Sequence, residues 1–136
     1  MSTAPVRVPR SVVDQVVAHA RAALPNEACG YLVGLDDRVT RFVPVVNAEP
    51  SPFFYRMDST DQLRIEQELA EAGEDVVASY HSHTRSPAFP SRTDLELAGP
   101  FEGTYAILSL GSDPPVLKAF TMGRGRIAPR PLVVEG

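Results

Sequence analysis

Two histidines separated by a single residue, His81 and His83, have a spacing that suits metal chemistry. In an extended strand, residues two apart project to the same side, so the two imidazoles can converge. Asp94 follows His83 by eleven residues, just inside an expected short helix, and the proline-containing loop between them can fold it back. Two imidazoles and a carboxylate with an open fourth position are the arrangement of a catalytic zinc ion.

Each of these fragments also has a simpler explanation. A His-x-His pair standing alone is more often a strand-end pair or a solvent-facing pair than a metal site. The run from Ser91 to Asp94 is equally a helix capping box, with Ser91 as the N-cap and Asp94 at the third helical position. The two interpretations of Asp94 compete, because a carboxylate bound to zinc is poorly placed to reach back to the cap backbone.

Glu27 opens an apolar stretch directly after Pro25 and Asn26. Its simpler interpretation is a solvated acid at the end of a strand, because most glutamates lie on the surface. The functional interpretation is a general base that takes the proton from zinc-bound water, a role that needs a carboxylate outside the ligand set.

Together these residues resemble the JAMM signature of the MPN-domain metallopeptidases. That signature is an upstream glutamate, then His-x-His, seven residues, Ser, two residues and Asp, and Glu27, His81, His83, Ser91 and Asp94 match every fixed position. The resemblance extends over nearly the whole chain. It implies one zinc ion per chain, held by His81, His83 and Asp94, with water as the remaining ligand. It also implies that Glu27 is the general base and later the acid, and that Ser91 donates a hydrogen bond to the developing oxyanion.

The chain resembles the prokaryotic Mec-type peptidases in its short length and in the segment of residues 47–58. That resemblance implies a ubiquitin-like sulfur carrier protein as partner, with hydrolysis at its C-terminal Gly-Gly tail and release of cysteine or a short extension. Two alternatives stay open: an isopeptidase that removes a ubiquitin-like modifier, and a non-catalytic MPN scaffold. The fold of the family resembles that of the zinc deaminases, but their His-x-Glu and Pro-Cys-x-x-Cys patterns are absent, which disfavours deamination.

Four residues near these motifs are candidates for substrate binding. Phe53, Phe54 and Tyr55 can form the walls of a slot for a glycine tail or can fill the core. Arg85, in the loop between the ligands, can bind the carboxylate of a released cysteine in fork geometry or can be a solvated loop residue.

Two further residues with chemical potential have structural interpretations. Cys29 lies within an apolar strand pattern, and nothing around it activates a thiol, so we predict a packed side chain. His19 falls on an expected helix, where a solvated or edge histidine is the simplest prediction.

Helical and strand patterns alternate along the chain, which predicts an α/β fold: a single-domain mixed β-sheet flanked by helices. The resemblance implies the MPN/JAB fold, which is cytidine-deaminase-like. We expect a helix over residues 11–24 with Ser11 as its N-cap, a second from Asp58 or Ser59 to about residue 72, and a third over residues 91–98. The expected strands cover residues 6–8, 28–35, 39–46, 76–81, 104–110, 116–121 and 127–134.

Composition narrows the class of protein further. A chain of 136 residues is enough for one domain, which we expect to span residues 1–136. Seventeen acidic against thirteen basic residues give a net charge of −4, which argues against nucleic acid or an anionic membrane as the main partner. A single cysteine cannot form an internal disulfide, and no apolar run has the length of an export signal or a membrane span. We therefore expect a cytoplasmic protein.

Overall fold

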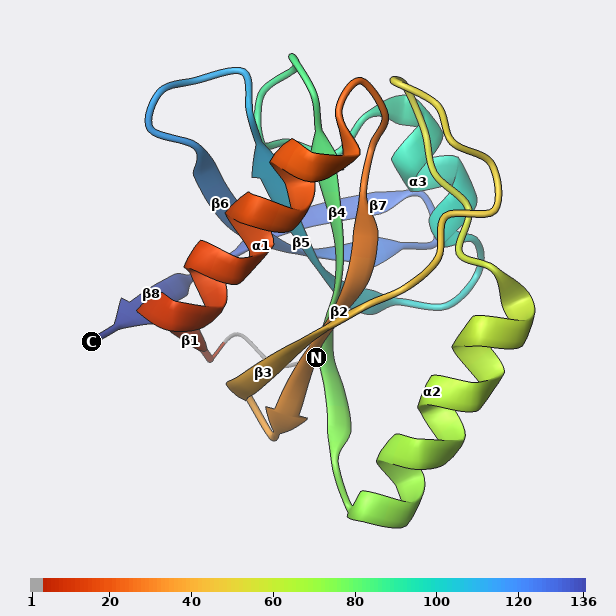
Figure 1. Cartoon of the computed structure of the whole chain (residues 1–136), viewed down its shortest axis with the longest axis vertical. Coiled ribbons are helices and arrows are strands. Elements are labelled where there is room, and N and C mark those ends of the chain that lie inside the picture. Colours follow the sequence, from red (N-terminus) through yellow and green to blue (C-terminus); the bar gives the residue numbers. More distant parts are fainter. Residues whose placement is uncertain (1–3) are drawn as a thin grey trace.

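A computed structural model describes residues 4–136 as one mixed sheet with three helices packed against it (Figure 1). The sheet has eight strands in the order β7-β6-β5-β4-β2-β3-β1-β8. Strand β1 is parallel to β3 and β8, and β4 is parallel to β5, while the other neighbours are antiparallel. The predicted mixed sheet with flanking helices is confirmed. The strands are β1 (Val6–Pro9), β2 (Cys29–Leu35), β3 (Arg38–Pro44), β4 (Asp75–His83), β5 (Gly103–Ser109), β6 (Val116–Gly123), β7 (Arg126–Arg130) and β8 (Leu132–Glu135).

Strand β2 lies in the middle of the sheet and is covered on both faces. Because alternate side chains of a strand point to opposite faces, Leu32 packs with α1, whereas Tyr31 and Val33 pack with α2. Six of its seven residues are buried, which explains why the sequence there reads as a continuous apolar run.

Helix α1 (Arg10–Ala23) buries Val12, Val13, Val16 and Ala20 against the first face of the sheet. The predicted N-cap at Ser11 is wrong, since the helix starts one residue before it and Pro9 occupies the cap position with no side-chain hydrogen bond. Pro9 ends β1 in extended backbone and leads directly into the first turn, so no residue is left between strand and helix for a polar cap.

Helix α2 (Ser59–Ala72) covers the second face, where Ile65 and Leu69 are buried. Asp58, rather than Ser59, is its N-cap, and the Asp58 carboxylate accepts from the backbone N–H of Asp61 at 3.0 Å. Gly73 ends the helix in the left-handed conformation at φ 69°, as a C-terminal glycine does in many helices. The third helix, α3 (Arg92–Ala98), begins after the N-cap Ser91, as predicted.

The predicted single strand over residues 127–134 is wrong. The chain forms β7 and β8 instead, and Pro131 separates them. Proline has no N–H to donate to a ladder, so the strand is interrupted there. Strand β7 pairs with β6 at one edge of the sheet, and β8 pairs with β1 at the other. Because a single residue joins these two edge strands, the sheet is curved so that its two edges come together at Pro131.

Gly34 allows β2 and β3 to approach at a bulge in their pairing. A Cβ atom built at Gly34 would lie 1.9 Å from the carbonyl oxygen of Arg38, which is backbone and cannot rotate away. We therefore expect Gly34→Ala to lower the free energy of unfolding by about 1–3 kcal/mol, as overpacked substitutions do. Gly103→Ala is the matched control, since its Cβ would meet only the Tyr105 ring at 3.6 Å. Urea denaturation of both variants measures the difference, and equal midpoints would contradict the prediction.

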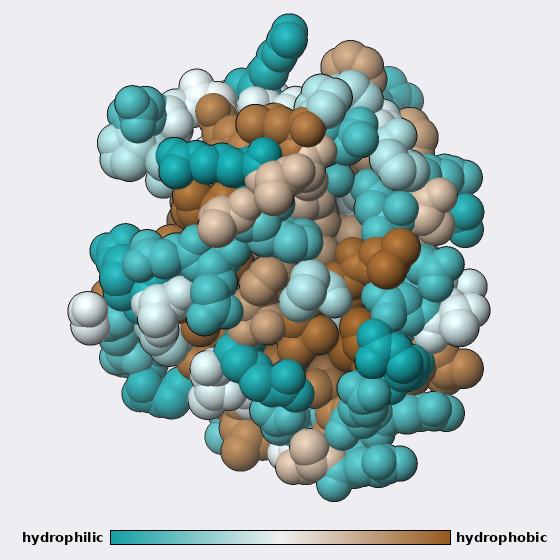
Figure 2. Space-filling model, in the orientation of Figure 1, coloured by the Kyte–Doolittle hydropathy of each residue, from teal (hydrophilic) through white to brown (hydrophobic). Residues whose placement is uncertain are grey.

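Hydrophilic side chains surround most of the face shown in Figure 2, and hydrophobic ones are visible mainly toward its middle and top. Within residues 4–136, no helix is both long enough and apolar enough to span a bilayer.

Candidate metal centre and active site

Strand β4 carries both histidines. It continues to His83, two residues beyond the predicted end, so both imidazoles extend from regular strand. Tyr80 points into the core under α1, and alternation therefore sends His81 and His83 to the opposite face, the side of α2. Hydrogen-bonded neighbours hold the strand on both sides, with Cys29 of β2 opposite His81 and Ser109 of β5 opposite His83. Both histidines are buried.

Helix α3 brings Asp94 to the same place. Its Oδ2 atom lies 2.9 Å from Nε2 of His83 and 3.1 Å from Nε2 of His81. The same oxygen accepts from the backbone N–H of Ser91 at 2.9 Å, while Ser91 Oγ accepts from the backbone N–H of Asp94 at 3.0 Å. The capping box is therefore complete while Asp94 also faces both imidazoles. The prediction that these two roles compete is wrong, because the helix start itself points toward the end of β4.

These three residues fit a divalent metal ion. Their donor atoms lie within 4.8 Å of one another, and the two histidine Nε2 atoms are 3.3 Å apart. Donors about 2.0–2.1 Å from a tetrahedral zinc ion stand roughly 3.3 Å apart, so the cluster has the required size. Asp94 Oδ1 is buried and has no hydrogen-bond partner among the described residues, which leaves it available as a ligand atom.

The second nitrogen of His83 fixes how its imidazole is presented. Nδ1 lies 2.8 Å from the carbonyl oxygen of Pro87, which can only accept, so Nδ1 carries a proton and Nε2 faces the cluster. Burial alone would lower the pKa of His83, but the hydrogen bonds to Asp94 and to Pro87 outweigh it and raise the pKa. For Asp94, burial acts to raise the pKa, but the hydrogen bonds from His81 and His83 leave it well below its usual range. Asp94 is therefore an anion, the form that binds a cation.

Glu27 stands between α1 and β2, and its backbone is held from two sides. Its N–H donates to the carbonyl oxygen of Ser51 at 2.8 Å, and its carbonyl oxygen accepts from the side-chain amide of Asn47 at 3.1 Å. The side chain is 5% exposed, and its Oε1 atom has no partner among the described residues. Burial raises the pKa of Glu27 to about 8, with His83 lowering it and Asp94 raising it further. A carboxylate with a pKa near the working pH is suited to receive and return a proton.

Two residues that position this site were not singled out by sequence analysis. Ser82, between the two histidines, exchanges hydrogen bonds with Ala28: Ser82 Oγ accepts from the Ala28 N–H at 2.8 Å, and the Ser82 N–H donates to the Ala28 carbonyl at 3.0 Å. This pair fixes β4 beside the residue that follows Glu27. Asn47 also accepts from the backbone N–H groups of Glu49 and Arg56, so it organises the loop that clamps Glu27. An asparagine at the start of a proline-rich loop is a recognised turn signal and could have pointed to this role.

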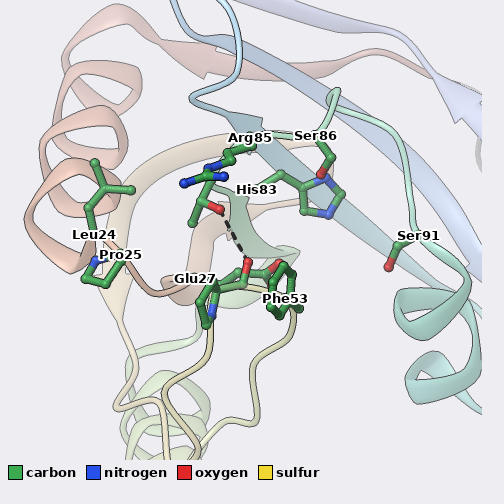
Figure 3. A pocket seen from close by; sticks show the side chains of 10 residues that line it. Leu24, Pro25, Glu27, Phe53, His83, Arg85, Ser86 and Ser91 are labelled. Atoms are coloured by element: carbon green, nitrogen blue, oxygen red, sulfur yellow. Dashed lines mark hydrogen bonds between the residues drawn. The ribbon is translucent and has the colours of Figure 1, made fainter.

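Glu27, His83 and Ser91 line one cavity of about 660 Å³. Figure 3 shows Leu24 and Pro25 on one side of it, Glu27 and Phe53 below, Arg85 above and Ser91 on the far side. Phe53 is 80% exposed and belongs to this wall, consistent with the slot interpretation. Because Ser91 Oγ already accepts from the Asp94 N–H, its own O–H is free to donate to a group in the cavity.

The other two aromatic candidates lie elsewhere. Tyr55 stacks on the His81 ring, with centroids 4.6 Å apart and planes at 24°, and packs against the core under α2, so it supports the imidazole of this candidate ligand. Phe54 is half-buried and does not line this cavity, which leaves its predicted role as a wall without support.

The structural interpretations of Cys29 and His19 are consistent with the structure. Burial raises the pKa of the Cys29 thiol to about 12, and Sγ contacts the carbonyl oxygen of Val45 at 3.4 Å, so it is an unreactive packed side chain. His19 is an edge histidine that contacts the rings of Phe42 and Tyr80.

Two imidazoles and an aspartate beside an uncommitted glutamate point to a metal-dependent hydrolase. Comparison with known families agrees, since Prok-JAB, the prokaryotic homologs of the JAB domain, matches residues 9–123. The chain therefore belongs to this family, and it is a JAMM-type peptidase.

Individual relatives are consistent with this assignment. The CysO-cysteine peptidase of Mycobacterium tuberculosis is 47% identical over 100 residues, which cover 72% of this chain and 68% of the relative. The desampylase of Haloferax volcanii is 38% identical over 92 residues, which cover 62% of this chain and 66% of the relative. The solution structure of protein DSY2949 from Desulfitobacterium hafniense superposes with a TM-score of 0.86 at 34% identity and covers 95% of this chain and 92% of that one.

Proposed function

We propose that this protein is a zinc peptidase that hydrolyses an amide at the C-terminal Gly-Gly tail of a ubiquitin-like sulfur carrier protein and releases cysteine or a short extension. The observation that carries this proposal is the shared cavity, in which Glu27 and Ser91 flank the buried cluster of His81, His83 and Asp94. The substrate is supported by the similarity to a CysO-cysteine peptidase. The buried free thiol of Cys29 is suited to a reducing compartment, and we place the reaction in the cytosol.

The reaction needs a metal ion and two proton-handling side chains. His81, His83 and Asp94 would hold a zinc ion, which when bound would supply a Lewis acid to polarise the scissile carbonyl and acidify water. Glu27 Oε1, buried and without a hydrogen-bond partner among residues 4–136, takes the proton from the water whose oxygen bonds to the carbonyl carbon. The Ser91 O–H donates to the carbonyl oxygen as negative charge develops on it. Glu27 then gives the proton to the leaving nitrogen as the C–N bond breaks, which yields a carboxylic acid and a free amine.

The shape of the cavity favours a glycine-rich tail. The cluster is buried, and His83 is only 2% exposed, so a substrate backbone must come close to reach it. Glycine has no side chain to prevent that approach and adopts an extended backbone without strain. The exposed Phe53 ring offers an apolar wall along which such a tail can lie.

Incubation with purified CysO-cysteine, followed by intact mass measurement, tests the proposal. We expect the substrate to lose the mass of one cysteine residue when zinc is present. A desampylase among the relatives gives the isopeptidase alternative a specific basis, so a carrier joined to a lysine side chain is assayed in parallel. Cleavage of the isopeptide substrate alone would favour that alternative. An absence of zinc binding together with no cleavage of either substrate would favour a scaffold.

Ser91→Ala tests the oxyanion role and separates it from the helix cap. We expect kcat/KM to fall about 10²- to 10³-fold, as for the loss of one oxyanion donor, and stability to fall by about 1 kcal/mol through the lost cap. Asp58→Ala is the matched control, because Asp58 caps α2 in the same way and is not part of the cavity lining. The control is expected to lose similar stability and no activity. Equal kinetic losses in both variants would show that Ser91 acts only through helix stability.

A further inference from the structure

We propose that Arg85 is a specificity residue that binds the free α-carboxylate of the residue being released. The enzyme would then act on tails that end one residue beyond the scissile amide, in preference to conjugates that lack a carboxylate there. This inference rests on the proposed hydrolysis of a carrier tail and specifies which tails are cleaved.

Arg85 has the right distance from the reacting groups. It follows the candidate ligand His83 by two residues, so its Cα lies at most about 7 Å from that of His83. The carboxylate of a tail that ends one residue beyond the scissile carbonyl lies one residue length, about 3.5 Å, from that carbonyl. A long arginine side chain that starts near His83 can span this distance. In Figure 3 the guanidinium of Arg85 lies over the pocket, between Leu24 and His83, and it lines the same cavity as Glu27 and Ser91.

The backbone that carries Arg85 is held rigidly. A Cβ atom at Gly111 would lie 2.1 Å from the carbonyl oxygen of Arg85, so only glycine allows the two loops to pack this closely. Ser109 Oγ donates to the carbonyl oxygen of Ser86 at 2.6 Å, and the Leu110 N–H donates to the carbonyl oxygen of His83 at 3.0 Å. These contacts present the side chain from a fixed point, although the side chain itself is exposed.

The guanidinium is available for an anion. Within residues 4–136, Arg85 has no carboxylate partner at ion-pair distance, whereas Arg92, the next arginine in the sequence, pairs with Glu96. A second hollow of about 240 Å³ adjoins the cavity and is lined by Arg85 and Lys118, so two cations face the same region. A guanidinium binds a carboxylate through two parallel hydrogen bonds, a geometry that neither a carboxamide nor an alkyl amide can complete.

The test compares CysO-cysteine that has a free C-terminal carboxylate with the same protein ending in a carboxamide. We expect wild-type kcat/KM to be about 10- to 100-fold higher for the substrate with the free carboxylate than for the carboxamide. A pair of charge-assisted hydrogen bonds contributes a difference of about this size. In Arg85→Ala the acid is expected to lose that advantage, while cleavage of the amide stays within about twofold of wild type. Arg85→Lys keeps the charge without the fork and is expected to fall between them.

Arg92→Ala is the matched control, since this exposed arginine directly follows Ser91 in the chain but lines neither hollow. It is expected to leave both rates unchanged. If Arg85→Ala slows the acid and the amide equally, or slows neither, the carboxylate subsite is wrong even though the enzyme cleaves the carrier. If the wild-type zinc-loaded protein cleaves neither substrate, the proposed function itself fails.

Discussion

Glu27→Gln is expected to retain one zinc ion per chain and to lose about 10²- to 10⁴-fold in kcat, the contribution of a positioned general base. Glutamine keeps the size and shape of the side chain, so the buried position beside the cluster stays filled. It cannot accept a proton at neutral pH, and the water and the leaving nitrogen are then left without their proton carrier. Zinc content is measured by elemental analysis of the purified variant, and turnover by intact mass of CysO-cysteine.

The control for Glu27→Gln is the same substitution at a glutamate that is remote from the active site. Glu96→Gln on α3 is suitable, because Glu96 is exposed and, within the described part of the chain, forms an ion pair with Arg92 alone. We expect it to match wild type in zinc content and turnover. Full turnover in Glu27→Gln would contradict the role of general base, and loss of zinc from that variant would identify Glu27 as a ligand.

Asp94→Asn is expected to lose zinc and hydrolysis while the protein stays folded. An asparagine side-chain oxygen can still accept from the Ser91 N–H, so the start of α3 is retained, but the negative charge that a cation needs is gone. Asp94→Ala removes both functions, and we expect it to lose zinc equally and about 1 kcal/mol more stability.

Zinc content after dialysis and thermal unfolding of the two variants separate the two functions of this residue. The metal function predicts that both variants are zinc-free, and the cap function predicts that only Asp94→Ala is clearly less stable in the absence of metal. If Asp94→Asn retained stoichiometric zinc, the carboxylate would not be a required ligand.

Most of the fold follows from local sequence signals. The covered central strand β2 and the two long helices were predictable, because apolar periodicity and capping residues act over a few neighbouring positions. The division of residues 127–134 was not, because the pattern on both sides of Pro131 is equally strand-like and only the curl of the whole sheet assigns β7 and β8 to opposite edges. The start of α1 was missed because β1 continues directly into the helix.

In the candidate site too, some features could be predicted from local sequence and others could not: the side-chain motif was recognisable, whereas the long-range hydrogen bonds that hold it were not. The five residues of the JAMM pattern were recognisable from spacing, and the structure gathers them around one cavity and its buried cluster. The hydrogen bonds from the Ala28 N–H to Ser82 Oγ and from the Asn47 side chain to the Glu27 carbonyl oxygen join segments 54 and 20 residues apart. Their donors and acceptors are largely main-chain groups, which every residue type possesses, so the sequence does not show which residues pair. Of these residues, Asn47 alone carries a turn signal that could have pointed to its role.

The shared oxygen of Asp94 has a thermodynamic consequence. Since Oδ2 is already held by the Ser91 N–H and faces both imidazoles, the rotamer of this carboxylate is set when the chain folds. The entropy lost in immobilising the side chain is therefore part of folding and would not weaken the binding of the proposed zinc ion. Such preorganisation also limits rearrangement of the donors, which disfavours ions that demand a larger or six-coordinate shell.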